Sequence, residues 1–238
     1  MKSDSTNTTK QLKPEAIAAE LDRDGFARLP GLISPDVCQN LRNLFSGPED
    51  QFRSVIHMAR YNFGRGTYKY FSYPLPPAVQ QLREQLYAVL APVANDWAAR
   101  LGATPDWPAT LAELLERCRA AAQDRPTPLI LHYGAGDYNC LHQDIYGDIH
   151  FPLQVIIGLS DPEADYEGGE LVLTEQRPRM QSRPMVLRPA LGEGIVIPVR
   201  ERPVSGKRGW YRTQIRHGVS EITRGERFTL GLIFHDAR

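Results

Sequence analysis

The stretch LHQDIYGDIHF, residues 141–151, carries His142 and Asp144 two positions apart. Side chains at positions i and i+2 of a strand share one face, so this imidazole and this carboxylate can hold one metal ion together. A second histidine from a distant strand would complete a set of two histidines and one carboxylate, and His217 in TQIRHGVSEI is the candidate. That ligand set suits Fe(II), because it leaves coordination positions open for other ligands.

A single His-x-Asp pair is weak support, since roughly 0.35 such pairs are expected by chance in a chain of this composition. Independent support comes from GERFTLGLIF, in which Arg227 lies ten residues after His217. If this segment is a strand, one of its faces carries Arg227, Thr229, Gly231 and Ile233, and the other is apolar. A guanidinium, a hydroxyl and a gap left by glycine in one line suit a small dicarboxylate, which arginine binds through two hydrogen bonds.

Plainer explanations exist for each of these residues. His142 and Asp144 would also fit a salt bridge at the end of a strand, His217 would fit a turn, and Arg227 would fit a surface charge. The neighbouring pair Asp148 and His150 fits a turn aspartate and a structural or substrate-side histidine.

The remaining candidates have mostly structural explanations. His57 and His235 fit structural roles, and Cys140 fits an inert buried thiol. Three cysteines without CxxC spacing indicate reduced thiols and a cytoplasmic location.

The elements that must position the site change character halfway along the chain. Residues 14–24, 77–101 and 107–123 have helical patterns. A further helix is predicted to begin at Ser34-Pro35-Asp36. Short apolar runs separated by Gly, Pro and Asp then predict strands at 128–134, 140–145, 150–159, 170–174, 185–188, 194–199, 211–217 and 226–235. Many short strands at this spacing indicate a β-sandwich or jelly roll with helices packed outside it, an α+β protein.

We expect a disordered tail at 1–12 and a single domain at 13–238, with a helical N-terminal half at 13–127 and a jelly-roll core at 128–238. The chain has 238 residues, zero net charge and no apolar run long enough to span a membrane. The charge is uneven, because residues 177–216 carry ten basic and two acidic side chains. We predict that 177–212 is a basic insert between core strands.

Taken in order, these pieces resemble the 2-oxoglutarate/Fe(II)-dependent oxygenases. The resemblance covers roughly residues 128–236 and rests on Tyr133, His142-Gln143-Asp144, the turn-strands EGGELVL and GEGIVIP, His217, and Arg227-Phe228-Thr229. It implies a double-stranded β-helix, a cupin-like jelly roll with N-terminal packing helices. It also implies that His142, Asp144 and His217 bind Fe(II), and that Arg227 binds the C5 carboxylate of 2-oxoglutarate with help from Thr229 and Tyr133.

The implied reaction couples O₂ and 2-oxoglutarate to hydroxylation, or oxidative demethylation, at a substrate C–H bond. A bacterial branch of the family is proposed to act on nucleic acids. The alternatives are a peptidyl, amino-acid or small-molecule hydroxylase, or a non-catalytic jelly-roll module that binds an anionic ligand.

Two features favour a nucleic acid. In RYNFGRGTYKYF, residues 60–71, cations alternate with aromatic rings, which suits phosphates and unpaired bases. The basic segment 177–216 supplies further positive charge. The candidate substrate residues are Arg60, Arg65, Tyr68, His150 and Arg212. Aromatic packing on the barrel and a solvated loop are the respective alternatives, and the oligomeric state is left open.

Overall fold

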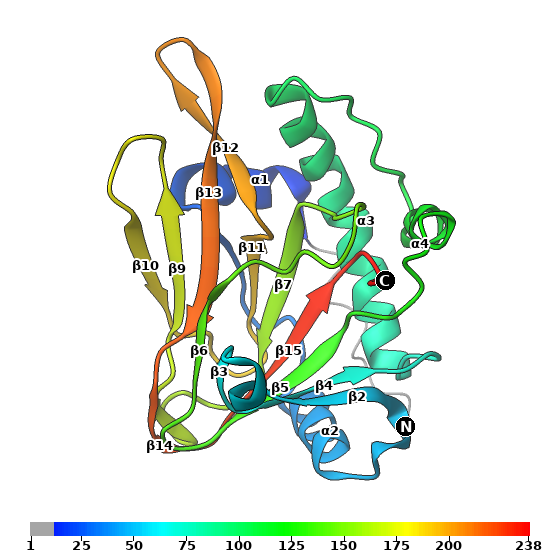
Figure 1. Cartoon of the computed structure of the whole chain (residues 1–238), viewed down its shortest axis with the longest axis vertical. Helices are drawn as coiled ribbons and strands as arrows, with labels where there is room; N and C mark the ends of the chain where they lie inside the picture. The colour runs from blue at the N-terminus through cyan, green and yellow to red at the C-terminus, as the bar shows by residue number, and fades with distance from the viewer. Residues whose placement is uncertain (1–11) are drawn as a thin grey trace.

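Two antiparallel sheets form the centre of the computed structural model, which describes residues 12–238 (Figure 1). The large sheet has the strand order β1 (Ala27–Leu29), β11 (Gly194–Pro198), β7 (Leu153–Gly158), β15 (Arg227–Ile233), β5 (Leu129–Tyr133), β4 (Thr67–Phe71) and β2 (Phe52–His57). The small sheet has the order β10 (Arg183–Leu187), β9 (Leu171–Gln176), β13 (Gly209–Val219), β6 (Tyr138–His142) and β3 (Gly64–Arg65). This two-sheet arrangement is the predicted jelly roll.

Two further strand pairs extend this frame. Strand β12 (Glu201–Gly206) forms a hairpin with β13, and β8 (Tyr166–Gly168) pairs with β14 (Ile222–Gly225). The hairpin projects from one end of the molecule in Figure 1.

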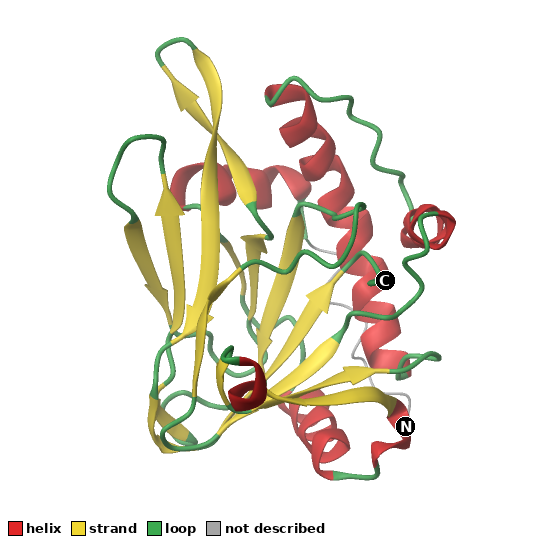
Figure 2. Cartoon of the chain, in the orientation of Figure 1, coloured by secondary structure: helices red, strands yellow, loops and turns green. Residues whose placement is uncertain are grey.

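Within residues 12–238, the α-helices are α1 (Pro14–Asp24), α2 (Pro35–Ser46), α3 (Pro77–Arg100) and α4 (Leu111–Ala120), shown in red in Figure 2. Helix α2 starts as predicted, because Ser34 accepts a hydrogen bond from the backbone of Val37. Helix α4 is shorter than the predicted 107–123, since Thr110 and Glu113 form a capping box at its start.

One face of strand β15 packs in the main apolar core, and the other face borders the cavity between the two sheets. Phe228, Leu230 and Leu232 belong to one apolar core with residues of all four of these helices. Arg227 and Thr229, on the opposite face of the strand, line a cavity between the sheets. The period-two pattern of this segment therefore predicted both faces correctly.

The N-terminal half differs from the helical prediction between β2 and β4. The sequences FRSVIH and TYKYF form two antiparallel strands that extend the large sheet beyond β5. Both are rich in aromatic and β-branched residues, which pack well on a half-buried pleated surface. This segment brings aromatic side chains to the edge of the cavity.

Much of the predicted basic insert at 177–212 forms strands that pair within the two sheets. Strands β10 and β11 lie within it, and the β12–β13 hairpin follows. Arg202 is 3% exposed and lies 2.8 Å from Glu175, and its guanidinium also donates to the carbonyl of Leu21. Part of the positive charge of this segment is therefore structural.

The start of the described chain packs on the core. Leu12 contacts the main apolar cluster, so it is not part of a disordered tail, and residues 1–11 of the predicted tail lie outside the described residues. None of the helices in residues 12–238 is long and apolar enough to cross a membrane.

Arg83 connects α3 to the end of β15. Its guanidinium is fully buried, pairs with Asp236 at 2.8 Å, and donates to the carbonyl oxygens of Ile233 and Phe234. This contact fixes the helix layer to the strand that lines the cavity.

We expect Arg83→Ala to lower the free energy of unfolding by about 3 to 5 kcal/mol, because it leaves the Asp236 carboxylate buried without its cation. Arg23→Ala is the control: Arg23 pairs with Asp24 on the surface, where its side chain is 67% exposed, so its loss should leave the unfolding midpoint unchanged. Urea denaturation followed by circular dichroism measures both. Equal midpoints for the two variants would contradict a stabilising role for Arg83.

Candidate functional site

The pairing of β6 with β13 sets His142 directly opposite His217. The centroids of the two imidazole rings are 4.3 Å apart. Asp144 reaches both rings, with Oδ1 3.5 Å from Nε2 of His142 and Oδ2 3.2 Å from Nε2 of His217. One ligand atom from each residue lies within 4.8 Å of the other two, so the three predicted ligands form a grouping of a size that fits a metal ion.

The position of Asp144 differs from the prediction in one respect. Strand β6 ends at His142, so Asp144 lies in the following loop and not two residues further along a strand. The loop turns the carboxylate toward the same side as the imidazole.

Two hydrogen bonds orient the ligand side chains. Nδ1 of His142 is 2.8 Å from the carbonyl oxygen of Cys140, which leaves Nε2 facing Asp144. The hydroxyl of Tyr146 donates to Oδ1 of Asp144 at 2.6 Å. Partners of this kind set the direction of metal ligands and raise their affinity.

The three groups influence one another electrostatically. Burial opposes the ionisation of Asp144, but its contacts with His217 and His142 outweigh burial and hold the pKa of the carboxyl well below its usual value. Burial and the neighbouring His142 lower the pKa of His217. Burial also acts to lower the pKa of His142, but the hydrogen bond and the charge of Asp144, together with the hydrogen bond to the Cys140 carbonyl, outweigh burial and raise it. A carboxylate and a neutral imidazole are the forms that bind metals.

Arg227 lies at another wall of the same cavity. Its side chain is 1% exposed, and Nε, Nη1 and Nη2 have no hydrogen-bond partner among the described residues. Its guanidinium carbon lies 5.7 Å from the ring centroid of Tyr133 and 6.0 Å from that of Tyr166. A buried cation without an anion is costly, so this pocket is complementary to an anion from outside the chain.

Two hydroxyl groups accompany the guanidinium. Thr229 follows on the same face of β15 and is 2% exposed. Tyr133 is fully buried, and its hydroxyl accepts a hydrogen bond from Asn139 at 3.3 Å. Burial raises the pKa of Tyr133, so its phenol keeps its proton and remains a donor.

The cavity that contains these groups has a volume of about 370 Å³. Its mouth is marked by Phe63 and Leu141, which are 48% and 45% exposed. Strands of both sheets form its walls. The three predicted metal ligands and Arg227 line it, together with Tyr68, Tyr70, Leu129, Tyr146, Gln154 and Ile233. It is large enough for a small dicarboxylate and part of a second molecule.

The predicted substrate residues lie in different places. Tyr68 lines the cavity, while Arg60 and Arg65 are exposed near its mouth but not in its wall. His150 faces a separate hollow beside α4. Arg212 lies on the β12–β13 hairpin, 2.9 Å from a glutamate of β12, and does not line the cavity. His150 and Arg212 are therefore not placed to contact a substrate in the cavity.

Polar cavity residues that were not predicted from the sequence include Tyr70, Asn139, Tyr146 and Gln154. Tyr146 is two residues after Asp144, and this proximity was a usable signal. The others come from strands that meet only in the folded chain, so no local pattern marks them.

Residues 66–237 match the Oxygenase-NA family, described as an oxygenase catalysing oxidative methylation of damaged DNA. The chain belongs to this oxygenase family. Two uncharacterized proteins of Mycobacterium tuberculosis, MT2286 and Rv2227, are each 51% identical to it over 167 residues, which are 70% of this chain and 72% of theirs.

Solved structures show the same fold at 14 to 15% identity. A prolyl-4-hydroxylase of Pseudomonas putida has a TM-score of 0.52 over 94% of this chain and 99% of its own. A 2OG-Fe(II) oxygenase family oxidoreductase of Burkholderia pseudomallei has 0.53 over 95% and 93%, and a prolyl hydroxylase of Trichoplax adhaerens has 0.52 over 94% and 89%. The predicted double-stranded β-helix and oxygenase class are confirmed.

The residues of this site fit the cofactor and cosubstrates of that class, Fe(II), 2-oxoglutarate and O₂. The grouping of His142, Asp144 and His217 has the right donor types for Fe(II). The unpartnered guanidinium of Arg227, in the same cavity, fits a carboxylate of 2-oxoglutarate.

We expect Asp144→Ala to weaken Mn(II) binding at least about 100-fold, and Tyr146→Phe to weaken it about 10-fold, because the tyrosine only orients the carboxylate. Mn(II) serves as a redox-stable probe, and free Mn(II) is measured by electron paramagnetic resonance. His150→Ala is the control with unchanged affinity. Wild-type affinity in Asp144→Ala would place the metal elsewhere.

Proposed function

We propose that this oxygenase uses Fe(II), O₂ and 2-oxoglutarate to oxidise a C–H bond on a nucleobase of single-stranded nucleic acid, removing an N-alkyl group where one is attached. The observation that supports it is the joining, in one cavity, of a metal-binding triad, an unpaired buried guanidinium and a wall of tyrosine rings. The family description, which concerns damaged DNA, points to the same substrate class.

His142, Asp144 and His217 would hold the iron on one side and leave its other positions to 2-oxoglutarate and O₂. When bound, the iron and 2-oxoglutarate supply an oxidant formed from O₂ with release of CO₂ and succinate. Tyr146 keeps the Asp144 carboxylate in place by its hydrogen bond. The protein thus contributes ligand geometry and a largely enclosed cavity.

Arg227 would bind the far carboxylate of 2-oxoglutarate. Its three nitrogens are buried without partners, so a carboxylate would satisfy two of them in a bidentate contact. Tyr133 and Thr229 supply hydroxyl groups at the same wall of the cavity. These contacts orient the cosubstrate and exclude water from its charged end.

The mouth of the cavity offers a surface for unpaired bases. Tyr61 and Phe63 are stacked with ring centroids 5.5 Å apart, yet are 55% and 48% exposed. Arg60 and Arg65 are exposed on either side of them in the chain. Stacking rings beside cations are typical of surfaces that bind single-stranded nucleic acid.

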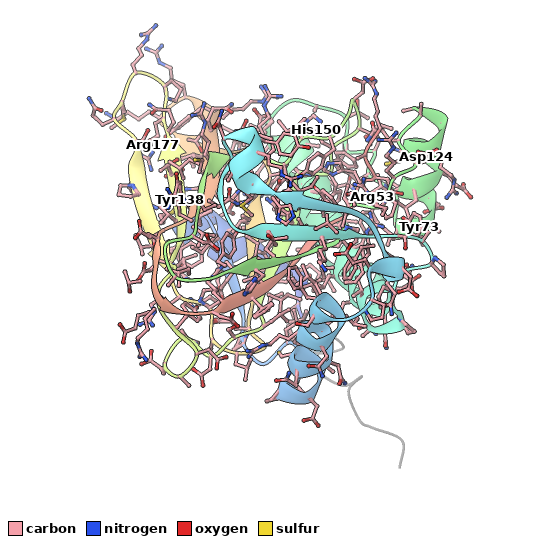
Figure 3. The ribbon with its side chains drawn as sticks, turned by 60° about the horizontal axis from the view of Figure 1, so that its bottom comes forward. Arg53, Tyr73, Asp124, Tyr138, His150 and Arg177 are labelled. Carbon is pink, nitrogen blue, oxygen red and sulfur yellow. The ribbon has the colours of Figure 1, made fainter. Side chains whose placement is uncertain are left out.

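The segment 177–216 is a weaker candidate for this contact than predicted. Arg177 and Arg183 lie 3.9 and 3.8 Å from Glu175, and Arg188 lies 3.5 Å from Glu163. Figure 3 shows Arg177 on the same side of the molecule as Tyr138 of β6 and opposite Arg53 of β2. Lys207 and Arg208 remain exposed at the tip of the β12–β13 hairpin.

Family membership argues against the non-catalytic binding module. A turnover assay distinguishes a nucleic-acid substrate from a peptide or a small molecule. Succinate formation by the purified enzyme with Fe(II), 2-oxoglutarate and O₂ should rise when single-stranded oligonucleotides with N-methylated bases are added, and formaldehyde should appear in equal amount. No stimulation by any of them would exclude this substrate class.

Arg227→Met should raise the KM for 2-oxoglutarate about 100-fold, since it removes a buried, charge-assisted contact to the cosubstrate. The variant should fold at least as stably as the wild type, because an unpaired buried cation is lost. Arg224→Met, at an exposed arginine on β14, is the matched control and should keep the wild-type KM. An unchanged KM in Arg227→Met would remove the arginine from cosubstrate binding.

The double variant Arg60→Glu, Arg65→Glu should bind a fluorescein-labelled single-stranded oligonucleotide about 10-fold or more weakly, with the slope of log affinity against log salt reduced by about 2. Lys207→Glu with Arg208→Glu is the charge-matched control on the hairpin and should retain affinity. Fluorescence anisotropy at several salt concentrations measures both. The opposite ranking would place the nucleic acid along the hairpin.

A further inference from the structure

One buried polar group of the cavity has no role in holding the metal or the cosubstrate. Gln154 on β7 lines the cavity, its side chain is 2% exposed, and Nε2 has no hydrogen-bond partner among the described residues. A buried donor without a partner lowers the stability of the fold, and few native side chains are left in this state. A ligand that supplies an acceptor would remove this cost.

The strand register places Gln154 far from Arg227. Gln154 is paired with Ile233, the last residue of β15, and Arg227 is the first residue of that strand. At a rise of about 3.4 Å per residue, the two ends of β15 are roughly 20 Å apart. One small dicarboxylate held at Arg227 does not extend to Gln154, so the amide lies on the substrate side of the cavity.

The surroundings of Gln154 suit a flat, neutral ring. Ile233 clusters with Tyr70 and Leu129, and Tyr146 packs against them. The rings of Tyr70 and Tyr146 lie edge to face at 6.2 Å, and their hydroxyl groups are hydrogen-bonded at 3.0 Å. The second register partner of Gln154, Ile197 on β11, is apolar. These walls offer aromatic contact, and no described residue accepts a hydrogen bond from Nε2 of Gln154.

This end of the cavity adjoins the metal ligands. The Tyr146 hydroxyl that contacts Tyr70 also donates to Asp144. A ring held between the tyrosines and Gln154 would therefore present a substituent toward the triad. The amide carries a donor and an acceptor side by side, the pattern that pairs with the edge of a nucleobase.

We infer that Gln154 is a specificity-determining residue that donates a hydrogen bond from Nε2 to a ring nitrogen or keto oxygen of the nucleobase being oxidised. This assignment rests on the proposed function and names the contact that selects among bases. A site built to hydrogen-bond its substrate discriminates strongly against analogues that lack the partner, because the buried group is then left unpaired.

The test uses the full-length enzyme with four single-stranded oligonucleotides, each carrying one of 1-methyladenine, 3-methylcytosine, 1-methylguanine or 3-methylthymine. Formaldehyde release gives kcat/KM for each. Gln154→Leu should lower kcat/KM for the best of the four by at least about 10-fold and flatten the ranking among them. Its KM for 2-oxoglutarate should not change. Gln39→Leu, at an exposed glutamine of α2, is the matched control.

Base analogues that each lack one acceptor complete a double-mutant cycle. The analogue that lacks the contacted acceptor should reduce wild-type kcat/KM to the level of Gln154→Leu, and the variant should not distinguish it from the parent base. Thermal unfolding separates this role from a structural one: Gln154→Leu should melt at or above the wild-type temperature, since an unpaired buried amide is replaced by an apolar group of similar size.

The outcomes separate the two proposals. Oxidation of an oligonucleotide by the wild type with an unchanged ranking in Gln154→Leu would overturn the role of Gln154 alone. So would a raised KM for 2-oxoglutarate with the ranking preserved, or a strongly lowered melting temperature. Succinate production without oxidation of any oligonucleotide would overturn the nucleobase proposal, and the assignment of Gln154 with it.

Discussion

The pairing of β6 with β13 at His142 and His217 is the constraint on which the rest of the site depends. A slip of one residue in an antiparallel pair turns every side chain to the opposite face, so this register alone sets both imidazoles inside the sandwich. The backbone at Gly218 helps to hold it, because a Cβ there would lie 2.6 Å from the carbonyl oxygen of Asn139. The register shifts between His217 and Val219, so the strand is irregular directly beside the ligand.

Two hydrogen-bond donors that lack partners lie at opposite ends of the cavity, and they differ in charge. At one end the three guanidinium nitrogens of Arg227 have no hydrogen-bond partner among the described residues, and at the other end Nε2 of the Gln154 amide has none either. A folded chain carries such groups at a cost to stability unless a ligand compensates them. The cavity therefore presents a cationic donor at one end and a neutral donor at the other, with the metal ligands in the same lining.

The parts of this site that the sequence predicted are those with a local pattern. The alternation along β15 identified Arg227 and Thr229 as inward-facing, and the spacing of His142 and Asp144 indicated convergence although Asp144 lies after the strand. The sequence did not reveal that Arg202, within the predicted insert 177–212, is buried against Glu175, because no local pattern links the two residues. Tyr70 and Tyr146 are 76 positions apart and meet only through sheet pairing, so their contact has no signature in the chain.

Tyr146 contacts both a metal ligand and the aromatic wall of the cavity. Its hydroxyl accepts a hydrogen bond from Tyr70 in the aromatic wall of the cavity and donates one to the Asp144 carboxylate. Burial and the nearby carboxylate raise the pKa of Tyr146 well above its usual value, so it remains a neutral donor. One hydroxyl therefore contacts both the ligand carboxylate and the aromatic wall of the cavity. The group that orients a metal ligand also holds Tyr70 in that wall, so the arrangement of the metal ligands and the shape of the cavity depend on the same side chain.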